Sequence, residues 1–187
     1  MTRRSLRVLT VGVLAAALLV MGAGFPAEQV PARHWAKSVC TEVGIWVQTA
    51  RSGASALNGQ ASTSANLPNV KHALVQYLGA TEDATRTVVE RLHAAGHPAT
   101  PQGTQAAAGL TKGFGRIESA LKGFEHDARA VPTGRPAVTL ARLEALQTKI
   151  NTKLGALNQA IGNLSRFDPG HKIQKAFRAT PACQSLS

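Results

Sequence analysis

Apolar residues in the C-terminal third of the chain follow a three- and four-residue alternation that strongly limits how the chain can fold. The positions are Leu140, Leu143, Gln147, Ile150, Leu154, Leu157, Ile161 and Leu164. Gln147 is the single polar member of this series. Residues at this spacing lie along one side of an α-helix and form a heptad seam. The pattern therefore predicts a long helix that packs lengthwise against neighbouring helices.

Two earlier segments have a helical periodicity and are followed by residues that end helices. The first helix is expected from about Pro31 to Ala56, followed by a small polar loop at Asn58–Ser64. The second begins at Leu67-Pro68, since proline is tolerated in the first turn of a helix. It is expected to end at Ala95–Pro98, where a glycine suits a left-handed cap and a proline prevents continuation.

A third helix is expected from about Pro101, and the two-proline turn Val131–Pro136 separates it from the fourth. Its inward positions are Leu110, Phe114, Ile117, Leu121 and Phe124. After a stop at Phe167–Gly170, a short last helix covers about His171–Arg178. Short turns between long helices favour antiparallel neighbours, and we find no convincing alternating strand pattern. The sequence predicts an all-α fold, an antiparallel up-down four-helix bundle with a short C-terminal helix.

Residues 1–24 have the order of a secretory signal peptide. Three arginines within the first seven residues precede the apolar run Val8–Val20, and the small residues Gly22–Gly24 follow. Cleavage before Phe25 would leave residues 25–187 as one secreted, extracytoplasmic helical domain; Ala32 offers a second cleavage position. The alternative is an uncleaved leader that anchors the protein, because the apolar stretch reaches about 18 residues, the lower limit for a membrane span.

The chain has two cysteines, Cys40 in the first predicted helix and Cys183 near the C-terminus. An even pair in an exported protein is expected to be oxidised. In an up-down bundle the first helix begins at the end where the fourth finishes, so the short last helix can bring Cys183 to Cys40. A reactive dithiol is the alternative, which the lack of a Cys-x-x-Cys spacing disfavours. We therefore predict a structural disulfide between Cys40 and Cys183 that ties the bundle.

Short motifs along the mature chain are shared with a known family. They are Trp35–Cys40 with Trp46, Ala95–Pro98 with Gly103, and Ala176-Phe177 with Ala182-Cys183. By these motifs the chain resembles an uncharacterised family of small secreted helical proteins and lipoproteins of actinobacteria. The resemblance covers nearly all of the mature chain. It implies a helical, disulfide-tied protein of the envelope or extracellular space and carries over no catalytic residues. Cys40 lacks the lipobox of the lipoprotein members, so the resemblance does not extend to lipid tethering.

Glu90, His93 and His97 are weak candidates for metal ligands, because they are spaced three and four residues apart. Gly96 and Pro98 flank His97, so the helix is expected to end before the three side chains share one face. His93 lies near the expected C-terminus of this helix, where the helix dipole stabilises a positive charge. We therefore expect no metal site and no cofactor.

Catalytic motifs that carry a recognisable mechanism are not found in the sequence. No serine lies in a Gly-x-Ser-x-Gly turn, and no glycine-rich phosphate-binding loop follows a predicted strand. Catalytic groups can also assemble from distant segments, so a hydrolase-type enzyme or a metal-binding protein is kept as a weaker alternative. The expectation is a non-enzymatic protein.

The chain is strongly basic, with 21 Lys+Arg against 10 Asp+Glu and a net charge of +11. From Arg129 onwards, nine basic residues are accompanied by only two acidic ones. The candidate binding residues are Arg135, Arg142 and Lys149, seven residues apart on an outer face of the fourth helix, and Lys172, Lys175 and Arg178 beyond it. The plain interpretation is a solvated face that keeps the protein soluble.

The functional interpretation of these residues is attraction to anionic cell-wall polymers, to a membrane surface or to an envelope protein. Nucleic acid is not an expected partner, because the chain is exported and has no recognition-helix motif or stacking aromatic platform. The sequence thus predicts an exported interaction or binding module of the cell envelope or extracellular space, with a basic C-terminal third.

Overall fold

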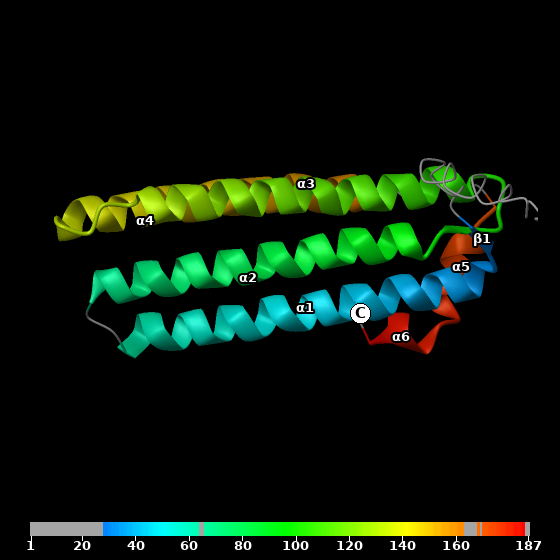
Figure 1. The fold of residues 1–187 in the computed structure, drawn as a ribbon, viewed down its shortest axis with the longest axis horizontal. Helices are drawn as coiled ribbons and strands as arrows, with labels where there is room; N and C mark the ends of the chain where they lie inside the picture. The colour runs from blue at the N-terminus through cyan, green and yellow to red at the C-terminus, as the bar shows by residue number, and fades with distance from the viewer. Residues whose placement is uncertain (1–27, 64–65, 163–167, 169, 186–187) are drawn as a thin grey trace, which may run out of the picture.

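The computed structural model describes residues 28–63, 66–162, 168 and 170–185. Its four long helices are α1 (Ala32–Thr63), α2 (Leu67–Ala94), α3 (Gly103–Ala130) and α4 (Pro136–Gly162). They lie side by side and successive helices run in opposite directions, with α4 behind α3 in the view of Figure 1. The short helices α5 (Lys172–Arg178) and α6 (Pro181–Gln184) lie at the end where α1 begins. The predicted all-α bundle with a short C-terminal helix is confirmed, whereas the leader and its cleavage positions lie outside the described residues.

Helix α1 is longer than the sequence indicated, because it ends at Thr63 and includes most of the predicted loop Asn58–Ser64. Glycine and small polar residues each cost only about 0.5–1 kcal/mol in a helix relative to alanine. Asn58, Gly59 and Gln60 are exposed and continue a helix that is stabilised by packing at earlier residues. The second half of α1 packs closely on α2: a Cβ atom at Gly53 would lie 2.7 Å from Cδ2 of Tyr77.

Two very short strands, β1 (Gln29–Val30) and β2 (His97–Pro98), form a parallel pair that the sequence pattern did not predict. The His97 amide donates to the Glu28 carbonyl at 3.0 Å, and the Ala99 amide donates to the Val30 carbonyl at 2.7 Å. Strands of two residues are too short to show an alternating pattern. The pair ties the segment before α1 to the connection between α2 and α3.

Helices α1, α2 and α3 build most of the hydrophobic core. All five predicted inward positions of α3, Leu110 to Phe124, are buried. Phe114 meets Trp46 of α1 edge to face, with ring centroids 5.5 Å apart. The remaining buried apolar members come mainly from α1 and α2: Trp35, Val39, Val75, Leu78, Val88 and Leu92. The helical periodicity of the sequence therefore identified the buried side of α3.

Two buried threonines on α2, Thr81 and Thr85, take the place of apolar residues in this core. The Trp46 Nε1–H group donates to Oγ1 of Thr85 at 2.8 Å. The hydroxyl of Thr85 donates in turn to the Thr81 carbonyl at 2.7 Å. The Thr81 hydroxyl donates to the Tyr77 carbonyl, so the Trp46 indole and both threonine hydroxyls are satisfied, which is the condition for burying them at low cost.

The predicted heptad seam of α4 is rotated by about one residue. The side chains turned inward are Thr139, Leu143, Leu146 and Ile150. Leu143 and Ile150 were predicted, but Leu140 is 49% exposed and Gln147 is exposed as well. Thr139 explains the rotation, because its buried hydroxyl donates to the Pro132 carbonyl at 2.6 Å and fixes the first turn of α4. The side chains of the predicted seam from Leu154 to Leu164 lie outside the described residues.

Helices α5 and α6 pack against α1, at the end of the bundle where α1 begins. Phe177 meets Trp35 edge to face at 5.8 Å between ring centroids. Cys40 and Cys183 form a disulfide with a Cα–Cα distance of 5.0 Å, which confirms the predicted pairing. Within the described residues, none of the helices has both the length and the apolar character that a bilayer crossing requires.

Candidate functional site

The six predicted basic residues do not form one continuous face; they fall into two groups. The N-terminal end of α4 and helix α5 lie at opposite ends of the bundle (Figure 1). Arg142 and Lys149 are exposed and border a groove between α3 and α4, and Arg135 lies outside that groove. Lys172, Lys175 and Arg178 line a separate pocket at α5. The two places are described in turn.

Lys172, Lys175 and Arg178, called here the α5 cluster, lie on the solvent side of α5. They line a pocket of about 400 Å³ together with Gly170, His171 and Gln174. Because they are three residues apart, the three side chains lie on one side of α5. Ile173 and Ala176 turn inward to the core. Within the part of the chain that the structure describes, their side chains make no ion pair, and no carboxylate lines the pocket. Three positive charges therefore face solvent together.

The acidic residue nearest in sequence to the α5 cluster, Asp168, is engaged with the backbone and does not neutralise the cations. It is buried, and its Oδ2 atom accepts a hydrogen bond from the Gln174 amide at 2.7 Å. The Asp168 carbonyl accepts a second bond, from the His171 amide, at 2.9 Å. His171 has a left-handed backbone with φ of 52°, a conformation that is uncommon outside glycine and is adopted more often by Asn, Asp and His than by other residues. Asp168 therefore fixes the start of α5.

Several further contacts hold α5 in place. The Thr180 hydroxyl donates to the Ala176 carbonyl at 2.7 Å, and the Gln184 side-chain amide donates to the Arg178 carbonyl at 3.1 Å. Together with the Trp35–Phe177 contact and the disulfide, they fasten the cluster to α1. The sequence analysis named the three cations but missed the role of Asp168. The Asp-Pro-Gly segment before α5 is the signal that points to it, since aspartate often bonds backbone groups in such turns.

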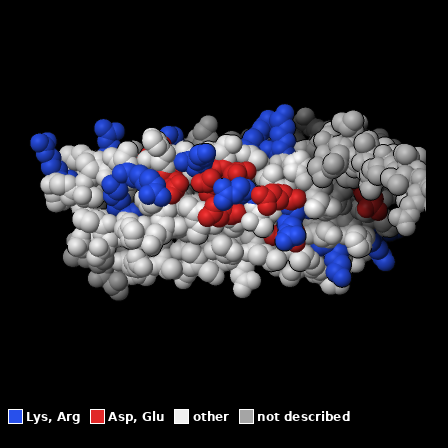
Figure 2. All heavy atoms as spheres, viewed as in Figure 1, with Lys and Arg blue, Asp and Glu red and all other residues white. Residues whose placement is uncertain are grey.

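The charges on α2 and α3 are arranged differently. Figure 2 shows Asp and Glu gathered at the middle of one face, over these two helices, with Lys and Arg among them. Arg86 pairs with Glu82 and Asp83 on α2, and Arg129 pairs with Glu125 on α3. Six of the ten acidic residues of the chain belong to α2 and α3. The middle of the bundle is thus close to neutral, and the unbalanced positive charge lies on the C-terminal elements.

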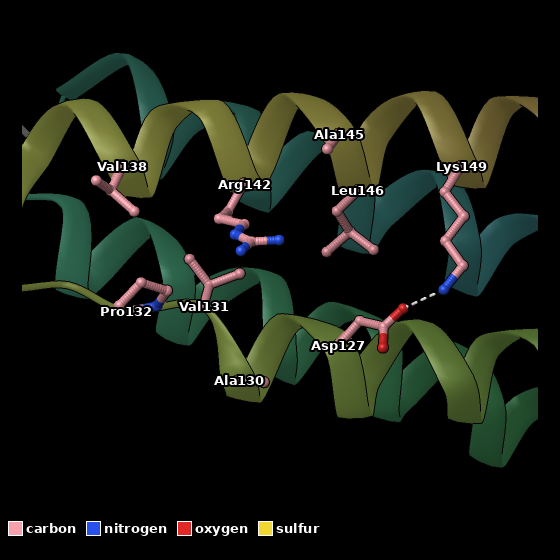
Figure 3. Close-up of a pocket in the computed structure, with 9 residues that line it drawn as sticks. All are labelled: Asp127, Ala130, Val131, Pro132, Val138, Arg142, Ala145, Leu146 and Lys149. Carbon is pink, nitrogen blue, oxygen red and sulfur yellow. Dashed lines mark hydrogen bonds and ion pairs between the residues drawn. The ribbon is translucent and has the colours of Figure 1, made fainter.

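A groove of about 540 Å³ runs between the C-terminal end of α3 and the N-terminal half of α4 (Figure 3). Val131 and Leu146, each about 5% exposed, are its most buried lining residues. Arg142 extends from α4 into the space between the helices. Lys149 and Asp127 form an ion pair across one end. The sequence analysis named Arg142 and Lys149 but had no signal for the groove, because it depends on how α4 is rotated.

The candidate metal ligands are not brought together. Glu90 and His93 are part of α2, whereas His97 lies beyond Gly96 in β2, with its Nδ1 atom 3.5 Å from the Pro98 carbonyl. The structure places no group of three or more His, Cys, Asp or Glu side chains, among those described, at a spacing that fits a metal ion. Gly96 has the left-handed backbone that the sequence predicted, with φ of 68°.

No model of a known family, no curated protein and no solved structure matches this chain. The resemblance to small secreted proteins of actinobacteria stays a prediction based on the short motifs given above. The position and charges of the α5 cluster are the basis for the proposed function.

Proposed function

We propose that this protein is an exported, non-enzymatic binding module of the cell envelope or extracellular space, and that its α5 cluster binds anionic polymers. Polymers with repeated phosphate or carboxylate groups, such as those of a cell wall, match a pocket lined by several cations. The actinobacterial resemblance favours the same location.

The observation that carries this proposal is the α5 cluster itself. Three cations line one pocket of about 400 Å³, and the neighbouring Asp168 is buried and bonded to the backbone. Exposed cations that lack a protein partner keep their charge available for a ligand, and like charges held together raise the local attraction for anions. The rigid attachment of α5 to α1 lowers the entropy cost of binding.

Export is supported by two further observations. The leader has the order of a signal peptide, and the Cys40–Cys183 disulfide is typical of oxidising compartments outside the cytoplasm. A membrane-anchored protein with the same basic cluster is the alternative form of the proposal.

Removal of the cluster charges should weaken polymer binding strongly. We expect the variant Lys172→Gln/Lys175→Gln/Arg178→Gln to raise the dissociation constant for long-chain polyphosphate or purified cell wall at low salt. The increase should be on the order of one hundredfold, since each cation beside an anionic surface contributes about 1 kcal/mol. Binding of the unmodified protein should fall steeply as salt rises towards about 1 M, because the Debye length shrinks to about 3 Å.

The matched control is Lys112→Gln/Arg116→Gln/Lys122→Gln, which removes the same charge from exposed positions of α3. It should change the dissociation constant by no more than about threefold, a small effect of net charge alone. Equal losses in both variants would mean that binding depends on overall charge and not on the cluster. Binding that ignores salt would refute an electrostatic mechanism.

The proposed export is tested by the intact mass of the protein from culture medium and from membranes, with and without reductant. We expect a species that starts at Phe25 in the medium and gains about two mass units on reduction of one disulfide. A full-length species confined to membranes would show that the leader is an anchor. Two free thiols in the unreduced protein would contradict the oxidising location.

A further inference from the structure

The groove between α3 and α4 combines an apolar lining with one unpaired guanidinium group. Its apolar members are Ala130, Val131, Pro132, Val138, Ala145 and Leu146. The Arg142 side chain extends into this space and makes no hydrogen bond or ion pair with any residue that the structure describes. The other charges of the groove, Asp127 and Lys149, neutralise each other. One uncompensated positive charge, on the exposed Arg142, therefore borders a groove whose walls are partly apolar.

The walls of the groove are held in position by side chains of two other segments. Lys71 on α2 donates from Nζ to the Val131 carbonyl at 2.7 Å. Thr139 donates to the Pro132 carbonyl at 2.6 Å and is itself fully buried. These bonds fix the start of the turn between α3 and α4. The groove is thus formed before any ligand arrives, as most small-molecule sites are.

We propose that this groove binds a linear amphiphile, an alkyl chain with an anionic carboxylate or phosphate head, with the head on Arg142. A guanidinium group binds either a carboxylate or a phosphate through two parallel hydrogen bonds. The apolar lining suits the chain, and the volume of about 540 Å³ lies within the range of natural ligand sites. The 40% exposure of Val138 leaves apolar surface at the rim that a bound chain would cover. This site is distinct from the α5 cluster.

Isothermal titration of the oxidised protein with decanoate, decyl phosphate and decanol tests the head group, with the two anions below their micelle concentrations and decanol below its solubility limit. Both anions should bind, and decanol should bind at least about tenfold more weakly, because a charge-assisted hydrogen bond is roughly twice as strong as a neutral one. If decyl phosphate binds more tightly than decanoate, phosphate is the preferred head group of the ligand. Decanol binding as tightly as the anions would overturn the role of Arg142.

Paired variants locate the head group. Arg142→Gln should weaken decanoate binding about tenfold or more, since hydrogen bonds to a charged group are among the strongest in proteins. Arg135→Gln removes the same charge seven residues earlier, outside the groove, and should leave the dissociation constant unchanged within about twofold. Arg142→Lys should keep part of the affinity, because it retains the charge without the paired donors. Equal losses at positions 135 and 142 would contradict the proposal.

A second pair locates the alkyl chain. Val138→Ser should weaken decanoate binding about threefold or more, whereas Leu140→Ser, at a similarly exposed position outside the groove, should not. Extending the chain from octanoate to dodecanoate should tighten binding about two- to fourfold per methylene group, the upper value being that of full burial. Affinity that does not rise with chain length, or that falls equally in both serine variants, would refute an alkyl site in the groove.

Discussion

Replacing Gly103 by alanine should lower the free energy of unfolding by about 4 kcal/mol, a loss that arises only from specific structural conflicts. Gly103 is buried at the first position of α3, beneath the β2 segment. An added Cβ atom would lie 1.8 Å from the carbonyl oxygen of Pro98 and 2.9 Å from its carbon. Both atoms belong to the backbone, so relief requires β2 and the start of α3 to move apart. Urea denaturation followed by circular dichroism measures the loss.

Gly115→Ala is the matched control, because a Cβ atom at this position of α3 has no described atom within 4 Å. Alanine is favoured over glycine in a helix interior, so this variant should gain about 1 kcal/mol. The same change of residue should therefore act in opposite directions at the start and near the middle of one helix. If Gly103→Ala were as stable as the unmodified protein, the close packing of β2 on α3 would be wrong.

Loss of the Cys40–Cys183 disulfide should lower the free energy of unfolding by about 5 kcal/mol in the chain-entropy model. The reason is the length of the loop, since the cysteines are 143 residues apart and the crosslink restricts almost the whole unfolded chain. The variant Cys40→Ala/Cys183→Ala should show this loss in urea denaturation, and the reduced unmodified protein should match it. The local stability of α5 and α6 should also fall, because the disulfide fastens them to α1.

Hydrogen exchange separates this local effect from the global one. Amides of Lys172–Gln184 should exchange faster in the disulfide variant, while those in the middle of α2 and α3 should follow the global stability. A loss below about 1 kcal/mol would mean that the unfolded chain is already compact or that the native crosslink is strained. Unchanged exchange at α5 would show that Phe177 and Ile173 hold the helix without the crosslink.

The sequence was sufficient for the helical architecture because that architecture depends on local periodicity. Apolar residues three and four positions apart define the buried side of α3 from Leu110 to Phe124, and the structure buries them all. The glycine and proline at Gly96 and Pro98 end α2 for local steric reasons. The disulfide followed from the up-down topology, which brings the beginning of α1 to the end of the chain.

Features that depend on contacts between distant segments could not be predicted. The rotation of α4 depends on a threonine, Thr139, which the apolar pattern ignores although its hydroxyl is satisfied by Pro132. The pairing of β1 with β2 involves only two residues from each segment. The extension of α1 to Thr63 has no apolar pattern to reveal it, since Asn58, Gly59 and Gln60 are all exposed.

The candidate sites were also predicted only where they depend on local sequence, and not where they depend on contacts between distant segments. The charge count identified the cations of the basic C-terminal third. It did not show that Lys172 and Arg142 lie at two separate sites. Their separation follows from the length of α4, which runs from one end of the bundle to the other (Figure 1). The groove could not be predicted, since it forms from the turn at Val131 and from the rotated face of α4.

Chemical-shift mapping of the isotope-labelled protein with short-chain polyphosphate would locate its polymer-binding surface residue by residue. We predict that the largest changes fall on the amides of Gly170–Arg178, and that they disappear as salt rises towards about 1 M. The middle of α2 and α3, where acidic and basic residues balance, should not respond. Changes spread evenly over all exposed cations, or centred on α2 and α3, would contradict binding by the α5 cluster.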